Sequence, residues 1–205
     1  MNKKFTTRHL VFMSVMIAIT LILDATPLGV IPLPMVSATI IHLPTIVTGI
    51  ILGPLAGAIV GAGMGVISLV HAITRPPSAL APLFWNPLVS ILPRIFIGVA
   101  SYYAYIGMKK ALGNYSKLKQ SISVGVGAFV GSMTNTILVL GMIYIVYKDA
   151  VEEIFNSIPD MAGLSALDFV VTTATGQGVL EAIVIVILTI PIVFAWQQFN
   201  RNRIS

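Results

Sequence analysis

Long apolar segments follow one another along almost the whole chain, with little polar sequence between them. Of the 205 residues, 57% are hydrophobic and only 9% carry a charge, whereas a soluble domain has about 25% charged residues. A folded surface so poor in charge would not stay dissolved, so the solvent of this protein is lipid. At roughly 20 residues per span, such a chain holds about five to seven membrane helices. The fold class predicted is therefore an all-α, polytopic membrane protein.

The apolar runs and the prolines between them predict six transmembrane helices within one domain, residues 1–205. The expected spans are 9–28, 41–52, 55–73, 86–108, 121–147 and 169–199. The second span is short, and Gly53-Pro54 forms a turn before the third. Proline-rich segments precede the second and fourth spans, at 29–41 and 75–85, so we expect structured loops there rather than helices.

Basic residues indicate how these spans are oriented. Six spans place both chain ends on one side, together with a group of Lys and Arg residues: Lys3, Lys4, Arg8, Lys109, Lys110, Lys117, Lys119, Arg201 and Arg203. The other side receives only Arg75 and Lys148. Because Lys and Arg accumulate in cytoplasmic loops, both termini are predicted to be cytoplasmic. The net charge of +5 is then a topology signal, and no nucleic acid partner is expected.

Several kinds of chemistry have no signal in this chain. It contains no cysteine, which excludes disulfides, thiolate metal sites and a Cys nucleophile. It has no nucleophile elbow, HExxH motif, metal-ligand cluster or nucleotide-binding Walker loop. We therefore expect no enzymatic activity, no cofactor and no metal. Uphill transport would need either ions or a separate ATPase as its energy source.

Polar residues inside the spans are the candidates for function, because each costs free energy in lipid unless it has a partner. The fourth span carries Asn86, Ser90 and Arg94, and the sixth carries Thr173, Gln177 and Glu181, each set at a spacing of four on one helix face. The fifth span carries Thr134, Asn135 and Thr136 near its middle. All three groups are expected at similar depth in the outer half of the membrane.

Two interpretations of these polar groups stay open. In the first, Arg94 and Glu181 pair and fix the register of the helices, as many buried ion pairs do. Alternatively, amides, hydroxyls and one basic group converge on a cavity for a small polar solute, with the proline-rich loops as lids. The two are compatible, since a ligand carboxylate would compete with Glu181 for Arg94.

Other polar or aromatic residues are placed near the outer ends of the spans. His42 and His71 are expected there as hydrogen-bonded residues of the interface or as ligand contacts. Trp85 either belongs to the interfacial aromatic belt or covers a bound solute. Asp24, at the end of the first span, is expected to be a solvated group.

Small residues at regular spacing predict close helix contacts. Gly57, Gly61 and Gly65 recur every four residues along the third span, a spacing that lets two helices approach closely. Ser14 and Ala18 form a shorter small-xxx-small pair on the first span, which either packs internally or faces a partner protein.

Particular strings of residues resemble a known family. They are NPLVSILPR at 86–94, TNTILVLG at 134–141, and HLP at 42–44 followed by GPLAG at 53–57. Together with six spans, a short second helix and lid-like loops, they resemble the substrate-binding S components of energy-coupling factor (ECF) vitamin transporters. The resemblance covers nearly the whole chain and is nearest to the pantothenate type.

The resemblance implies a vitamin receptor in the bacterial cell membrane that captures its solute from outside. Its partners would be a transmembrane coupling protein and two cytoplasmic ATPase subunits, and it would topple in the membrane to deliver its load. In such families an Ala-xxx-Ala motif on the first helix docks on the coupling protein; here the nearest match is Ser14-xxx-Ala18, where the first alanine is replaced. For pantothenate, Arg94 would bind the carboxylate, and Asn86, Asn135 and Gln177 the amide and hydroxyls.

Other functions are also compatible with the sequence. One alternative is the same kind of transporter with another vitamin or precursor as its ligand, such as hydroxymethylpyrimidine, folate or riboflavin. An ion-coupled secondary carrier would usually show internal repeats, and none is evident. An intramembrane enzyme would need a nucleophile and base, and an assembly protein would need no converging polar cavity.

Overall fold

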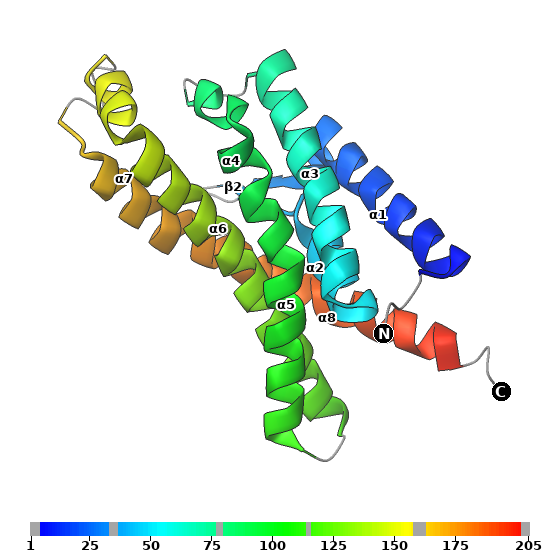
Figure 1. Ribbon diagram of the computed structural model, residues 1–205. Helices are drawn as coiled ribbons and strands as arrows, with labels where there is room; N and C mark the ends of the chain where they lie inside the picture. The colour runs from blue at the N-terminus through cyan, green and yellow to red at the C-terminus, as the bar shows by residue number, and fades with distance from the viewer. Residues whose placement is uncertain (1–4, 33–36, 77–79, 114–115, 158–162, 202–205) are drawn as a thin grey trace.

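The computed structural model describes residues 5–32, 37–76, 80–113, 116–157 and 163–201 (Figure 1). Its elements are α1 (Thr7–Ala25), η1 (Pro27–Gly29), β1 (Val30–Pro32), β2 (Ser37–Thr39), α2 (Leu43–Leu52), α3 (Pro54–Thr74), η2 (Ala81–Trp85), α4 (Pro87–Ser90), α5 (Leu92–Leu112), α6 (Lys117–Asn156), α7 (Ala166–Thr173), the π-helical segment η4 (Ala174–Gly178) and α8 (Val179–Arg201). Lys3, Lys4 and Arg203, used above to predict orientation, lie outside the described residues.

The predicted all-α membrane fold is confirmed. Five helical segments of the described chain are long and apolar enough to cross a membrane: Thr7–Ala25, Pro54–Thr74, Pro87–Leu112, Lys117–Asn156 and Ala166–Asn200. The remaining predicted span, the second along the chain, is the shorter apolar helix α2. The proline-rich segment before it forms a small antiparallel hairpin, in which Val30 of β1 pairs with Thr39 of β2.

The two ends of the molecule differ in charge. The start of α1, the end of α8 and the connection between α5 and α6 lie toward the same end, drawn at the bottom of Figure 1. We call it the basic end, because Lys109, Lys110, Lys117 and Lys119 flank that connection. At the opposite end α6 passes to α7, and Asp149, Glu152, Glu153 and Asp168 lie there.

The short helix α2 begins in the interior of the membrane and runs toward the basic end. Its 10 residues rise about 15 Å, half the roughly 30 Å of the hydrocarbon core. Thr45, in its first turn, donates a hydrogen bond to the Sδ of Met64, 3.8 Å away in the middle of α3. His42 does stand at the end of α2 that points away from the basic end, as expected, but this end lies deep in the molecule, where His42 is buried, and not at the membrane interface.

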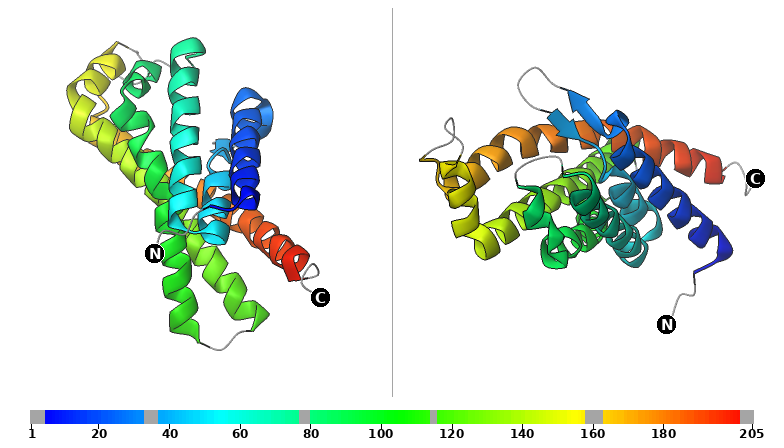
Figure 2. Two further views of the ribbon diagram at one scale, coloured as in Figure 1. Left: turned by 45° about the vertical axis from the view of Figure 1, so that its right-hand side comes forward. Right: turned by 90° about the horizontal axis from the view of Figure 1, so that it is seen from above.

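Non-helical backbone at this depth must be covered by protein, since lipid offers no hydrogen bonds. The hairpin satisfies this requirement by packing against α8 and η4, as the view from above shows (Figure 2). Its strands pair with each other, and Ile40 N–H donates to the carbonyl of Gly29 at 2.9 Å. The proline-rich segment therefore packs against η4 and α8 as a structured loop, with Val30 still 40% exposed.

The glycine stripe of α3 is an internal contact with α5. A Cβ added to Gly57 would lie 2.9 Å from the Cα of Gly98, and one added to Gly65 would lie 2.6 Å from the Cα of Ile91. Gly61 similarly faces the carbonyl of Arg94. Backbones this close leave no room for a side chain, so the glycines hold the helix that carries Arg94 against α3.

Two helix boundaries differ from those predicted. The fifth span was expected to end at Tyr147; the 40-residue α6 is kinked there, where Tyr147 has non-helical backbone angles, but its helix then resumes and ends at Asn156. The polar residues after Tyr147 therefore lie on a helix that projects at the far end. The sixth span is α7, η4 and α8 in succession, beginning three residues earlier than expected.

Candidate functional site

Buried polar side chains from several elements meet in the middle of the molecule. The helices α2, α5, α6 and α8 contribute His42, Arg94, Ser132 and Glu181, all buried. Asn135 of α6 and Gln177 of η4 are half-buried beside them. Intramembrane polar residues of this density are a sign of function, because each is costly in a purely structural role.

Arg94 is held by a backbone carbonyl of the preceding helix, α4, rather than by an acid. Pro93 has no N–H, so the carbonyl of Val89 lacks its usual intrahelical donor, and Arg94 Nη1 donates to that oxygen at 2.9 Å. The guanidinium carbon lies 5.6 Å from the centre of the Phe84 ring, a cation–π distance. Arg94 Nε is buried and has no hydrogen-bond partner. The guanidinium therefore keeps its charge beside neutral groups, with one donor unused.

His42 and α6 continue the polar cluster. The Nε2 of His42 and the Oγ of Ser132 share a hydrogen bond at 3.0 Å. One turn along α6 from Ser132, the Oδ1 of Asn135 is buried without a partner. The Oδ1 acceptor of Asn135 and the Nε donor of Arg94 thus both lie unsatisfied in the protein interior. Buried polar groups of this kind are rare in native proteins unless a ligand or water binds them.

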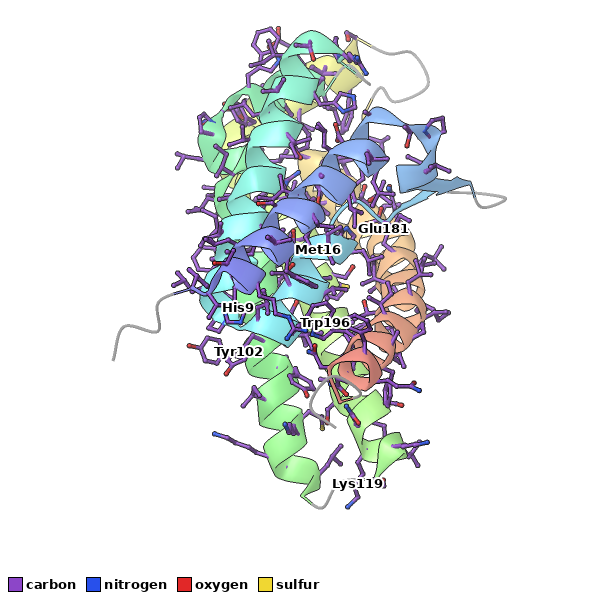
Figure 3. The ribbon with its side chains drawn as sticks, turned by 90° about the vertical axis from the view of Figure 1, so that its right-hand side faces the viewer. His9, Met16, Tyr102, Lys119, Glu181 and Trp196 are labelled. Carbon is purple, nitrogen blue, oxygen red and sulfur yellow. The ribbon has the colours of Figure 1, made fainter. Side chains whose placement is uncertain are left out.

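Glu181 ties the hairpin to α8. Its Oε1 accepts from the N–H of Thr39 at 2.9 Å, from the Oγ1 of Thr39 at 2.8 Å and from the Nε2 of Gln177 at 3.2 Å. Figure 3 shows Glu181 on the side of α8 that faces the hairpin. A Cβ added to Gly178 would lie 2.7 Å from the Cγ2 of Thr136, so the π-helical turn packs on α6 next to Asn135. π-helical turns are frequent at functional sites.

The segment from η2 to α4 covers Arg94. Asn86 caps α4 by accepting from Leu88 N–H at 3.0 Å and donates through Nδ2 to the hydroxyl of Tyr147 at 3.1 Å. Ser90 Oγ donates to the carbonyl of Phe84. Trp85 is 53% exposed and donates through Nε1 to the carbonyl of Ala72 at 3.1 Å. Trp85 therefore attaches the segment to α3, while Phe84 supplies the ring over Arg94.

Some of the expected groupings are wrong. Asn86, Ser90 and Arg94 do not share one continuous helix face, because α4 ends at Ser90 and α5 begins at Leu92. Arg94 and Glu181 do not pair with each other: Arg94 donates to Val89, and Glu181 accepts from Thr39 and Gln177. An ion pair elsewhere joins His71 Nδ1 to Asp24 Oδ2 at 2.7 Å. We expected Asp24 to be a solvated group at a helix end, and because it pairs with His71, this expectation is also wrong.

Residues that sequence reasoning missed complete the interior. Ser132 forms a hydrogen bond with His42, Thr39 with Glu181, and Tyr147 with Asn86. Ser132 lies at the helical spacing of three and four from Asn135 and Thr136, a signal that was available. Thr39 and Tyr147 carry no such signal, because their partners are far away in sequence.

The comparisons with known proteins agree with this architecture. A family model for the substrate-specific component of ECF transporters matches residues 8–193. The chain is 30% identical to the pantothenic acid transporter PanT of Lactococcus lactis subsp. cremoris, over 94% of this chain and 93% of that protein. It is also 30% identical to the pantothenate transporter PanT of Leuconostoc mesenteroides subsp. mesenteroides, over 64% of this chain and 65% of that protein.

A solved structure shares the fold. It is the S component of a bacterial ECF transporter, with a TM-score of 0.57 and 16% sequence identity over 94% of this chain and 96% of that one. The chain is thus a multi-pass protein of the bacterial cell membrane with transporters, not enzymes, as its relatives. It belongs to the family of substrate-specific components of ECF transporters.

Proposed function

We propose that this chain is the pantothenate-binding S component of an ECF importer. The observation that carries the proposal is the buried guanidinium of Arg94, with an unused donor at Nε, in the same interior as the unused acceptor Oδ1 of Asn135. Pantothenate has one carboxylate, one amide and two hydroxyls, so it offers an anion for the first group and donors for the second. The names of both PanT relatives support the same ligand.

Each candidate residue has a role in this proposal. Arg94 binds the carboxylate, and Asn135, Gln177 and His42 bind the amide and hydroxyls. Glu181 holds the hairpin beside the ligand through Thr39. Three further residues, Asn86, Ser90 and Trp85, hold the η2–α4 segment over the guanidinium.

The proposal includes the partners and the orientation. The chain, as a single transmembrane substrate-binding domain of residues 1–205, works with a transmembrane coupling protein and two cytoplasmic ATPase subunits. Both termini are cytoplasmic, the far end with its acidic residues is outside, and the protein topples to release its load. The docking face is α1, where Ser14 and Ala18 are exposed together with Val11, Val15 and Ile22.

A ligand panel on the purified chain in detergent tests the proposal. Thermal shift and calorimetry would compare pantothenate with hydroxymethylpyrimidine, folate, riboflavin and biotin. A ligand that binds only the native state adds roughly 2.7 kcal/mol of stability at a hundredfold excess over Kd, so pantothenate alone should raise the midpoint. Stabilisation by another vitamin would mean that this vitamin, and not pantothenate, is the ligand of this S component. Stabilisation by none would favour an ion-coupled carrier.

A further inference from the structure

A cleft at the basic end lies far from the polar interior and has a different composition. It has a volume of about 550 Å³ and lies where α8 runs past the α5–α6 pair. Lys109 and Tyr105 of α5 line it, with two residues of α6, Lys117 and Gln120, and three of α8, Phe194, Gln197 and Gln198. Figure 3 shows this region between Trp196 and Lys119, both of which are labelled.

The charge of this cleft is positive and is not balanced by acidic side chains. None of the described residues that line it is Asp or Glu. The sequence has no Asp or Glu in residues 1–23, 92–148 or 182–205, which include all the elements around it. Lys119, next to the cleft, donates to the carbonyl of Leu112 at 2.9 Å and so adds its charge to the same region.

The rest of the lining suits an oxyanion next to hydrocarbon. Gln120 Nε2 donates to Gln197 Oε1, which orients two amides at the edge of the cleft, and Gln198 supplies a third. Further along the same two helices, away from the basic end, an apolar groove of about 420 Å³ is lined by residues such as Ile122, Phe129, Val186 and Ile190. Polar donors therefore lie at the basic end of these helices, and apolar surface lies further into the membrane. A lipid has the same order, with its headgroup at the surface and its acyl chains below.

We propose that this cleft binds the phosphate of an anionic phospholipid headgroup. Lysines that only set topology need to lie near the membrane surface, as exposed Lys110 does. Lys109 and Lys117 instead come from two helices and line one cleft closed by a third. Basic clefts between transmembrane helices at the membrane surface are typical headgroup sites. A bound lipid would brace α8 against the α5–α6 pair.

Native mass spectrometry of the purified full chain tests this site. Phosphatidylglycerol and phosphatidylcholine with identical acyl chains would be titrated separately, and the dissociation constants compared. The wild type should prefer phosphatidylglycerol. The double variant Lys109→Gln/Lys117→Gln should lose that preference, with phosphatidylglycerol binding weakened about tenfold or more, because each removed lysine contributes to attraction of an anionic headgroup. Thermal midpoints would confirm that each variant is folded, and single Lys117→Gln replaces the double variant if it is not.

The matched control is Lys110→Gln/Lys148→Gln, which removes the same charge from exposed positions outside the cleft. It should bind phosphatidylglycerol within about twofold of the wild type. An equal loss in the control would overturn the site in favour of diffuse attraction. Displacement of the lipid by millimolar glycerol phosphate would assign the cleft to a soluble anion. If the cleft variant kept its lipid preference but no longer assembled with a coupling protein, the cleft would be a protein interface.

Discussion

At the scale of single residues, Arg94 is a charge that the protein keeps without an acidic partner. Its Nη1 uses the acceptor that Pro93 leaves free, its guanidinium carbon lies over the ring of Phe84, and its Nε remains unused. A guanidinium held in this way costs free energy in a membrane interior. An anionic ligand would recover part of that cost, which gives the site a preference for carboxylates.

Replacing Arg94 with Ala should therefore weaken pantothenate binding by about 100-fold, since losing one partner of a buried charge pair costs roughly 2–5 kcal/mol. Binding of the neutral alcohol analogue of pantothenate should change much less. Calorimetry with both ligands measures the difference. An equal loss for the two ligands would mean that Arg94 serves folding and not recognition.

Glu181 acts on the hairpin, and its substitution should loosen that element. In Glu181→Ala, Thr39 loses the acceptor of both its bonds, so hydrogen exchange of the Thr39 amide should accelerate about tenfold or more. Glu181→Gln keeps a carbonyl oxygen and should show a smaller change. Exchange mass spectrometry of the hairpin peptide gives the readout, and unchanged exchange in both variants would refute this role.

At the scale of elements, the close pairing of α3 and α5 positions Arg94. Gly57, Gly61 and Gly98 bring the two backbones together where no Cβ fits. Helices in lipid gain little from burying apolar surface, so close van der Waals packing of small residues supplies much of the association energy. The polar site thus depends on residues that have no polar atoms in their side chains.

A single added methyl group tests this packing. Gly61→Ala should lower stability in detergent by about 1–3 kcal/mol, because its Cβ would overlap the carbonyl of Arg94. Gly107→Ala is the control on α5, since nothing lies within 4 Å of its added Cβ. The control should be neutral or more stable by up to about 1 kcal/mol. Thermal unfolding of both proteins compares them, and equal stabilities would exclude steric packing at Gly61.

The exposed face of α1 is the element we assign to docking. Ala18→Trp should reduce vitamin uptake in cells that contain the coupling module by about tenfold or more, because a large ring would separate two closely packed helices. Binding by the isolated chain should be unchanged, since Ala18 is exposed and α1 contributes none of the proposed ligand contacts. Normal uptake by the variant would remove α1 from the interface.

At the scale of the whole molecule, charge distinguishes the two ends. As a substrate-specific component, the protein takes a vitamin substrate and works with an energy-coupling module. All the Lys residues of the described chain except Lys148 lie at the basic end, toward which α1 begins and α8 ends. The ligand must enter from the opposite end if the basic end is cytoplasmic, as the distribution of Lys and Arg predicts.

The absence of cysteine makes this orientation simple to measure. Lys148→Cys should react with a membrane-impermeant thiol reagent in intact cells. Lys110→Cys should react only after permeabilisation, because it lies at the other end of the molecule. The reverse pattern would invert the topology, and reaction of both variants in intact cells would contradict a single crossing of the membrane by α6 between the two positions.

Much of the fold was predictable from the sequence because the relevant forces act locally. Apolar length sets the spans, proline and glycine end helices, and lipid excludes charges from them. The all-α membrane class, the short second helix, the structured loop before it and the packing role of Gly57, Gly61 and Gly65 followed from these rules. Individual site candidates, such as Arg94 and Glu181, stood out because polar groups are costly in lipid.

Only the tertiary structure decided how those polar groups are partnered. Arg94 lies by Val89 and Phe84 instead of Glu181, Glu181 binds Thr39 from 142 residues away, and Asp24 pairs with His71. The depth of His42 likewise follows from where α2 packs on α3. Spacing along one helix tells which residues share a face. Which face meets which neighbour depends on close packing between segments far apart in sequence, and that is a property of the assembled fold.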